Sequence, residues 1–143
     1  MKLLTKHTDY AVRALMALAG QKLYIPAKEI SEKQGIPHQF LRGLLQQMVH
    51  HGLVESKLGP TGGVKMIVEA DTVKLLDLVE IFQEGIEFAE CLFRDKVCQN
   101  RPTCVLRTEL LRIEKIVNDE LSNITIQTLI DRLDENICPK GLI

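Results

Sequence analysis

Three of the four cysteines in the chain lie within fourteen residues, at Cys91, Cys98 and Cys104. The intervals between them are longer than in a structural zinc site, where paired cysteines usually stand about two to four residues apart. They also lack the C-x-x-C spacing of a dithiol redox centre. Iron–sulfur clusters take their thiolate ligands from looser loops, normally four of them. The spacing therefore favours an iron–sulfur cluster over zinc, with one ligand still to be supplied.

The residues around these cysteines suit an anionic cluster. Positive neighbours lower the pKa of a thiol and balance cluster charge, and four basic residues lie within or next to the segment: Arg94, Lys96, Arg101 and Arg107. Glu90 and Asp95 oppose this effect in part. The alternative is a set of unrelated structural cysteines, which the close grouping disfavours. Cys138 stands apart, beside Pro139, and is interpreted as incidental rather than as a ligand.

Hydrophobic periodicity predicts the elements that must position these cysteines. Helices are expected over residues 9–20, 27–34, 38–51, 72–84 (capped by Thr72), 104–121 and 126–135, and strands over 53–57 and 64–68. A short helix, a glycine turn, a longer helix and a two-stranded ribbon are typical of a winged helix-turn-helix. We therefore expect a mostly α fold. A winged helix-turn-helix DNA-binding domain would cover residues 1–70, and a cluster-binding loop with a long C-terminal dimerisation helix would cover 71–143.

The predicted helix 38–51 has a polar face opposite its apolar stripe. The stripe consists of Phe40, Leu41, Leu44, Leu45 and Met48, and the opposite face offers His38, Gln39, Arg42 and Gln46. Arginine can bind guanine, and glutamine can bind adenine, through paired hydrogen bonds in the major groove. Because residues near the start of a recognition helix usually reach the bases, Gln39 and Arg42 are the favoured base contacts. The competing interpretation is the ordinary solvated face of a surface helix.

The predicted ribbon and the charge distribution favour DNA over that simpler interpretation. Lys57 and Lys65 flank a glycine-rich tip that includes Gly62, as expected for a wing beside a phosphate backbone or minor groove. Residues 1–65 carry nine Lys and Arg against four Asp and Glu, whereas residues 66–143 carry nine against fifteen. A basic half in a chain of net charge −1 predicts double-stranded DNA as a partner.

The predicted helix 104–121 carries a second apolar stripe, formed by Leu106, Leu110, Ile113, Val117 and Leu121. Helical spacing does not distinguish an intramolecular core from a dimer seam. The acidic half of the chain has few other elements to cover a helix of about 18 residues, which spans about 27 Å. We therefore predict that this stripe forms the seam of a homodimer.

The combination of these features resembles a known family. The matching segments are Lys2–Thr5, Thr8–Leu15, Glu29–Ile36, His51–Gly63, the three-cysteine loop and Asn123–Ile126. In this order along residues 1–135, they resemble the small iron–sulfur winged-helix transcription regulators that include IscR, NsrR and RirA. The resemblance implies a homodimeric repressor or activator that binds an iron–sulfur cluster, [4Fe-4S] or [2Fe-2S], and dimerises through the helix after the cysteine loop.

Three positions refine the resemblance. Leu58 stands where the family often has an arginine before the Gly-Pro of the wing, and Arg107 stands where IscR-like members have a histidine ligand. The opening around Asp9 is closer to the NsrR and RirA branch, in which an acidic residue of the first helix can complete the partner subunit's cluster. The resemblance thus implies Asp9 as a fourth metal ligand. The alternative is a surface ion pair between Asp9 and Arg13, four residues apart.

These observations predict a cytoplasmic, homodimeric transcription repressor whose DNA affinity follows an iron–sulfur cluster that senses nitric oxide, iron or redox state. The alternative is a cluster-free winged-helix regulator controlled by a ligand or a partner protein. An electron-transfer enzyme is disfavoured because no flavin or nucleotide fingerprint is present. No stretch reaches the roughly 18 apolar residues of a membrane span, and charged residues interrupt the signal-like start of the chain.

Overall fold

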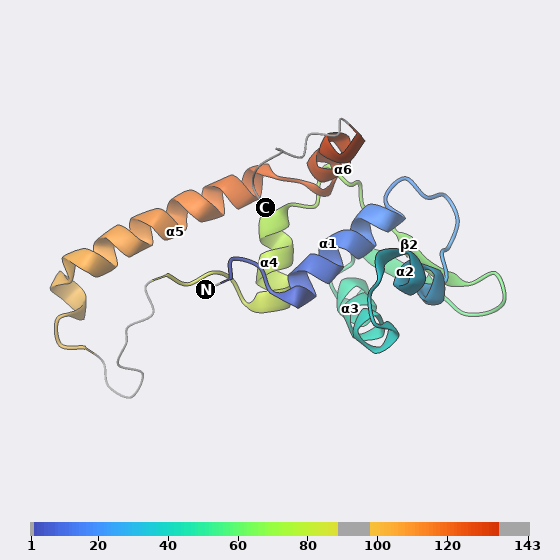
Figure 1. Ribbon diagram of the computed structural model, residues 1–143, viewed down its shortest axis with the longest axis horizontal. Coiled ribbons are helices and arrows are strands. Elements are labelled where there is room, and N and C mark those ends of the chain that lie inside the picture. The colour runs from blue at the N-terminus through green and yellow to red at the C-terminus, as the bar shows by residue number, and fades with distance from the viewer. Residues whose placement is uncertain (1, 89–97, 135–143) are drawn as a thin grey trace.

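The computed structural model describes residues 2–88 and 98–134 and is mostly helical (Figure 1). In these ranges the helices are α1 (Lys6–Leu18), α2 (Ala27–Gln34), α3 (His38–His50), α4 (Leu75–Gln83), α5 (Val105–Asn123) and α6 (Ile126–Asp134). The strands β1 (Val54–Lys57) and β2 (Gly63–Met66) follow α3, and a 3-10 turn, Arg101–Thr103, precedes α5. Within the same ranges, no helix has the length and apolar content needed to cross a bilayer. The order of elements confirms the predicted mostly α, winged helix-turn-helix fold.

Helix α1 begins three residues earlier than predicted because Thr5 caps it. The Thr5 hydroxyl accepts a hydrogen bond from the backbone N–H of Thr8 at 3.4 Å, which satisfies one of the free amides of the first turn. Thr8 is fully buried and donates its own hydroxyl to Gln83 Oε1 at 2.7 Å. The same oxygen accepts the backbone N–H of Thr5 at 3.0 Å. The end of α4 is therefore tied to the start of α1.

Helix α4 begins at Leu75, and the prediction of Thr72 as its cap is wrong. The backbone N–H and the hydroxyl of Thr72 both donate to the Glu69 carbonyl, at 3.0 and 2.7 Å, and close a turn ahead of the helix. At the start of the helix, the backbone N–H of Lys74 donates to Asp77 Oδ2 at 3.1 Å, as in one half of a capping box. The preceding turn thus uses the hydroxyl that was expected to cap α4.

A single apolar cluster holds the helix-turn-helix and the ribbon together. Its buried side chains come from α1, α2, α3 and both strands, joined by Val73, Leu78 and Ile126 from the second half of the chain. In α3 the buried positions are Leu41, Leu44, Leu45 and Met48. Phe40 was predicted in the same stripe but is 51% exposed, with its ring 5.6 Å from that of His7. The buried positions repeat at helical spacing, which leaves Phe40 at the edge of the stripe, against α1.

The wing is built close to the backbone of the α1–α2 connection. Strands β1 and β2 pair antiparallel, and on the other edge of β2 the backbones of Val64 and Ile25 exchange hydrogen bonds of 2.8 and 2.9 Å. A Cβ atom on Gly63 would lie 2.4 Å from the Ile25 carbonyl, and one on Gly62 would lie 2.1 Å from the Lys57 carbonyl oxygen. Both positions therefore require glycine for the shape of the wing.

Helix α5 extends away from the rest of the molecule (Figure 1). Near its C-terminal end, Leu121 is 5% exposed and clusters with Leu75 and Val79, and Val117 is partly buried against them. Toward its N-terminal end the apolar side chains are exposed, and Leu106 reaches 66%. The exposed set also includes Val105, Ile113 and Ile116. The predicted stripe thus has two environments: Val117 and Leu121 pack within their own chain, whereas Leu106 and Ile113 lie open and Leu110 is half-buried.

Candidate nucleic-acid interface and metal centre

Helix α3 presents the polar face that its sequence predicted. Pro37 precedes the helix and the left-handed Gly35 ends α2, so the two helices join through a tight turn. With the leucines of α3 buried, the side chains on the opposite face are exposed: His38, Gln39, Arg42 and Gln46. Gly43 lies among them, and a Cβ atom there would meet nothing within 4 Å. This exposed face carries side chains that can donate and accept hydrogen bonds.

The two wing lysines share an aromatic neighbour that sequence reasoning missed. The Nζ atoms of Lys57 and Lys65 lie 5.6 and 6.0 Å from the centre of the Tyr24 ring, within cation–π range. The Tyr24 hydroxyl donates to Glu55 Oε1 at 2.8 Å. This hydrogen bond, with smaller contributions from desolvation and from the charge of Glu55, raises the pKa of Tyr24 above its ordinary value. No signal within the sequence singles out Tyr24, because its neighbours come from the wing strands.

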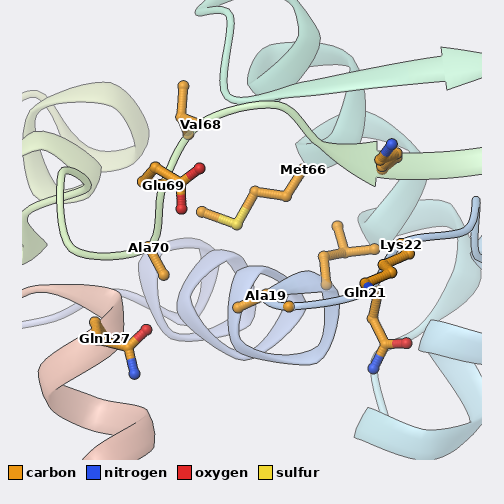
Figure 2. A pocket seen from close by; sticks show the side chains of 11 residues that line it. Ala19, Gln21, Lys22, Met66, Val68, Glu69, Ala70 and Gln127 are labelled. Atoms are coloured by element: carbon orange, nitrogen blue, oxygen red, sulfur yellow. The ribbon is translucent and has the colours of Figure 1, made fainter.

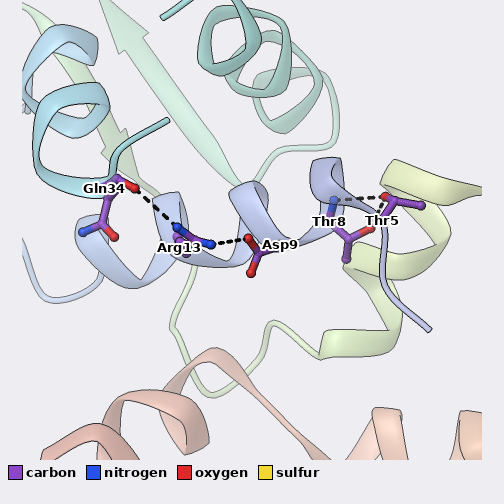
Figure 3. A network of polar contacts seen from close by, with 5 residues as sticks. All are labelled: Thr5, Thr8, Asp9, Arg13 and Gln34. Atoms are coloured by element: carbon purple, nitrogen blue, oxygen red, sulfur yellow. Dashed lines mark hydrogen bonds and ion pairs between the residues drawn. The ribbon is translucent and has the colours of Figure 1, made fainter. Parts of the chain in front are cut away.

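Asp9 forms the surface ion pair that was the alternative to metal binding (Figure 3). Arg13 Nη2 donates to Asp9 Oδ2 at 2.6 Å, and Arg13 Nη1 donates to the Gln34 carbonyl at 3.5 Å. The guanidinium also lies 5.7 Å from the centre of the Tyr10 ring. The side chains of Asp9 and Arg13 are 47% and 46% exposed, so the pair contributes at most about 1 kcal/mol. The carboxylate of Asp9 is therefore half-exposed, and its ion pair with Arg13 is weak.

Two of the three predicted thiol ligands lie at the base of α5. Cys98 and Cys104 are partly buried free thiols on either side of the 3-10 turn, whereas Cys91 lies outside the described residues. Cys104 caps α5, and its Sγ atom accepts the backbone N–H of Arg107 at 3.4 Å. A helix N-terminus stabilises negative charge, and thiolate is the usual ligand of iron–sulfur clusters. The donor chemistry at this end of α5 therefore fits an anionic cluster.

Arg107 follows Cys104 by three residues and brings a positive charge to the first turn of α5. A cavity of about 250 Å³ adjoins it, lined by Glu87, Arg101, Arg107, Leu111 and Glu114. The Nε atom of Arg107 is buried and has no hydrogen-bond partner among the residues that the structure describes. Among the described residues, no three His, Cys, Asp or Glu side chains form a group that could hold a metal ion. Cys91, the third predicted thiol ligand, lies outside these residues. The orphaned Nε atom is a buried donor suited to a negatively charged neighbour.

A second hollow lies behind the wing (Figure 2). It measures about 350 Å³ and lies between the end of α1, strand β2 and the first turn of α6. Met66 and Val68 give it apolar walls, and Lys22, Glu69 and Gln127 give it polar ones. This volume falls within the range of small-molecule sites.

Comparison with known proteins decides the function class. The model of the Rrf2 family, described as an iron-dependent transcriptional regulator, matches residues 4–132. The chain belongs to the Rrf2 family. A relative of this Rrf2 protein, the HTH-type transcriptional regulator IscR of Vibrio vulnificus strain YJ016, is 33% identical over 128 residues, which cover 88% of this chain and 76% of IscR. Protein aau3 of Rhizobium meliloti is 35% identical over 131 residues, which cover 89% of this chain and 84% of aau3.

Solved structures share the fold of this Rrf2 protein. T. potens IscR superposes with a TM-score of 0.75 at 22% identity, covering 99% of this chain and 94% of that one. CymR, described as the global cysteine regulator of B. subtilis, gives 0.73 at 21% identity, covering 92% of this chain and 98% of CymR. The family and its relatives show that the chain is a DNA-binding transcription regulator and not an enzyme.

Proposed function

We propose that this Rrf2 protein is a homodimeric repressor in the cytoplasm whose DNA affinity is controlled by an iron–sulfur cluster, [4Fe-4S] or [2Fe-2S]. Residues 1–70 read double-stranded DNA, and residues 71–143 carry the cysteine loop and the dimer helix. The observation that carries this proposal is the exposed polar face of α3 in a chain that also places two free thiols at the base of α5. The cluster responds to nitric oxide, iron or redox state.

The DNA-reading surface combines α3 with the wing. A helix with its side chains is about 10–12 Å wide and enters the major groove. In this arrangement Gln39 and Arg42, in the first turns of α3, contact base edges, while His38 and Gln46 flank them. The wing lysines contact the phosphate backbone, which positions the protein without reading sequence. Gly62 keeps the tip of the wing narrow enough to approach the DNA.

Arg42→Ala should reduce the preference for the operator over random DNA by about 1–3 kcal/mol, because a bidentate contact to guanine carries sequence information. Lys57→Ala is the matched control. It should weaken operator and random duplex alike and lower the salt slope by about one. Fluorescence anisotropy across a salt series measures both effects, with an operator selected from a random duplex pool. Equal losses for Arg42→Ala on the operator and on random DNA would contradict its role in base recognition.

Cys91, Cys98 and Cys104 supply three thiolates in this proposal, and Arg101 and Arg107, close to them in the sequence, contribute positive charge. A bound iron–sulfur cluster supplies one-electron redox chemistry and iron that small signal molecules can reach. The cap of Cys104 on α5 connects the ligand set to the start of the dimer helix. A change in the ligation of Cys104 would therefore act directly on the first turn of the helix that pairs the two subunits.

Asp9 completes the ligand set from the other subunit. A carboxylate is a harder donor than thiolate and suits iron–sulfur iron less well. The bond from Asp9 to the cluster is therefore expected to be weaker than the three thiolate bonds. Asp9→Ala should retain the cluster with an altered visible spectrum and should shrink the difference in DNA affinity between cluster-loaded and cluster-free protein. Arg13→Ala removes the ion pair but keeps the carboxylate, and it should preserve both properties. If the spectrum and the affinity difference in Asp9→Ala match those of the unsubstituted protein, Asp9 is only the partner of Arg13.

The hollow behind the wing supports a second candidate function, a cluster-free regulator that binds a small ligand. Its wall includes Lys65 of the wing and Gln127 of α6, so an occupant would touch both a DNA-contacting strand and the second half of the chain. Visible absorption distinguishes the two candidates after anaerobic loading with iron and sulfide. A coloured protein favours the cluster, whereas a colourless protein favours the ligand.

A further inference from the structure

Four polar side chains share one face of the wing, and we call them the wing cluster: Tyr24, Glu55, Lys57 and Lys65. Glu55 and Lys57 stand two residues apart on β1, so they point to the same side. Glu55 lies directly opposite Lys65 in the β1–β2 register. The Ile25–Val64 bridge on the other edge of β2 brings Tyr24, the residue before Ile25, alongside Lys65. Tyr24 therefore extends this face as a third strand would.

Within the wing cluster, Glu55 contacts Tyr24 and not the oppositely charged lysine across the ribbon. Opposite charges directly across an antiparallel pair attract, so Glu55 is positioned to pair with Lys65. Its carboxylate instead accepts the Tyr24 hydroxyl at 2.8 Å. Among the described residues, no ion pair joins Glu55 to Lys57 or Lys65. Both ammonium groups lie near the Tyr24 ring instead.

We propose that Tyr24 is a positioning residue that keeps both wing lysines available for DNA phosphates by holding the Glu55 carboxylate in a hydrogen bond. This inference rests on the proposed function, in which the wing lysines contact phosphate. A hydroxyl that donates to a carboxylate forms a charge-assisted hydrogen bond, which competes with an ion pair across the ribbon. The face of the ring attracts ammonium groups and keeps them at the surface of the wing. Without the hydroxyl, Glu55 would pair with Lys65 and cancel one of the charges that neutralise the DNA backbone.

The protonation state of Tyr24 is suited to this role. Its hydrogen bond to Glu55 raises the pKa of Tyr24, so the hydroxyl remains a donor throughout the neutral range.

Tyr24→Phe tests the proposal because it removes the hydroxyl and keeps the ring. On a random duplex at low salt it should weaken binding about three- to tenfold and lower the salt slope by up to about one, the equivalent of one lost phosphate contact. Glu55→Gln removes the charge that would capture Lys65. Its gain in affinity should be larger in the Tyr24→Phe background than in the unsubstituted protein, and this difference is a coupling that a double-mutant cycle measures.

Two results would overturn the inference. Unchanged binding by Tyr24→Phe would show that the hydroxyl does not restrain Glu55. An equal gain from Glu55→Gln in both backgrounds would show that Tyr24 and Glu55 act independently, as they would if the hydroxyl touched DNA itself. Failure of the proposed function looks different, because Lys57→Ala and Lys65→Ala would then leave the affinity for random DNA unchanged.

Discussion

Cys104→Ser is expected to abolish the iron–sulfur cluster and, with it, the control of DNA affinity. A cluster normally needs four ligands, and the chain offers three grouped thiols, so the substitution removes one of the thiolates that the cluster requires. Serine is among the preferred N-cap residues. It should therefore keep the start of α5, which Cys104 now caps through the Arg107 N–H. The substitution thus separates the ligand from the cap.

The measurement is visible absorption after anaerobic loading with iron and sulfide, followed by operator titration. Cys104→Ser and Cys98→Ser should stay colourless and bind DNA as the cluster-free protein does, whether or not iron was supplied. Cys138→Ser, at the cysteine that lies outside the grouped three and outside the described residues, is the control and should load fully. Full loading of Cys98→Ser, or loss of the cluster in Cys138→Ser, would refute the assigned ligand set.

Ile113→Asp should convert the protein to monomers and weaken operator binding by about two to four orders of magnitude, because linked half-sites gain that much from simultaneous engagement. Ile113 and Leu106 are exposed on the part of α5 that extends from the molecule, whereas Leu121 is buried against its own chain. We therefore place the proposed dimer seam on the N-terminal part of the stripe. A two-fold dimer would bind half-sites about one or two helical turns apart.

Sedimentation velocity measures the first effect and operator titration the second. Thr108→Asp is the matched control, because it adds the same charge to an exposed position on another side of α5. It should remain dimeric. If Ile113→Asp also remains dimeric, the exposed apolar side chains of α5 serve a different contact and the seam lies elsewhere.

Hydrophobic spacing predicted the presence of the main helices, because α3 and α5 each repeat apolar residues at helical intervals. It did not locate their caps, because a hydroxyl such as that of Thr72 can close a turn that precedes the helix instead of capping the helix itself. It also did not show which part of α5 is covered. Val117 is packed and Leu106 is open, although both belong to one stripe, since only the three-dimensional neighbours distinguish them.

The candidate site was predicted in part. The exposed residues of α3 followed from the face opposite its leucines, and the thiols followed from their unusual spacing. Gly62 was chosen as a DNA contact, and the structure adds a steric reason for that glycine: its closeness to the Lys57 carbonyl. Tyr24 was missed because its role depends on a backbone bridge between Ile25 and Val64, residues 39 positions apart, which no local pattern reveals.

The affinity of one preparation for its operator, with and without the cluster, tests the central claim most directly. The titration is done anaerobically at a fixed salt concentration, because salt alone changes DNA affinity by orders of magnitude. If the cluster connects the DNA-binding domains to the dimer helix, the cluster-loaded dimer should bind its operator at least about tenfold more tightly than the cluster-free dimer. This difference is a coupling of about 1.4 kcal/mol. Equal affinities for fully loaded and cluster-free protein would contradict the account.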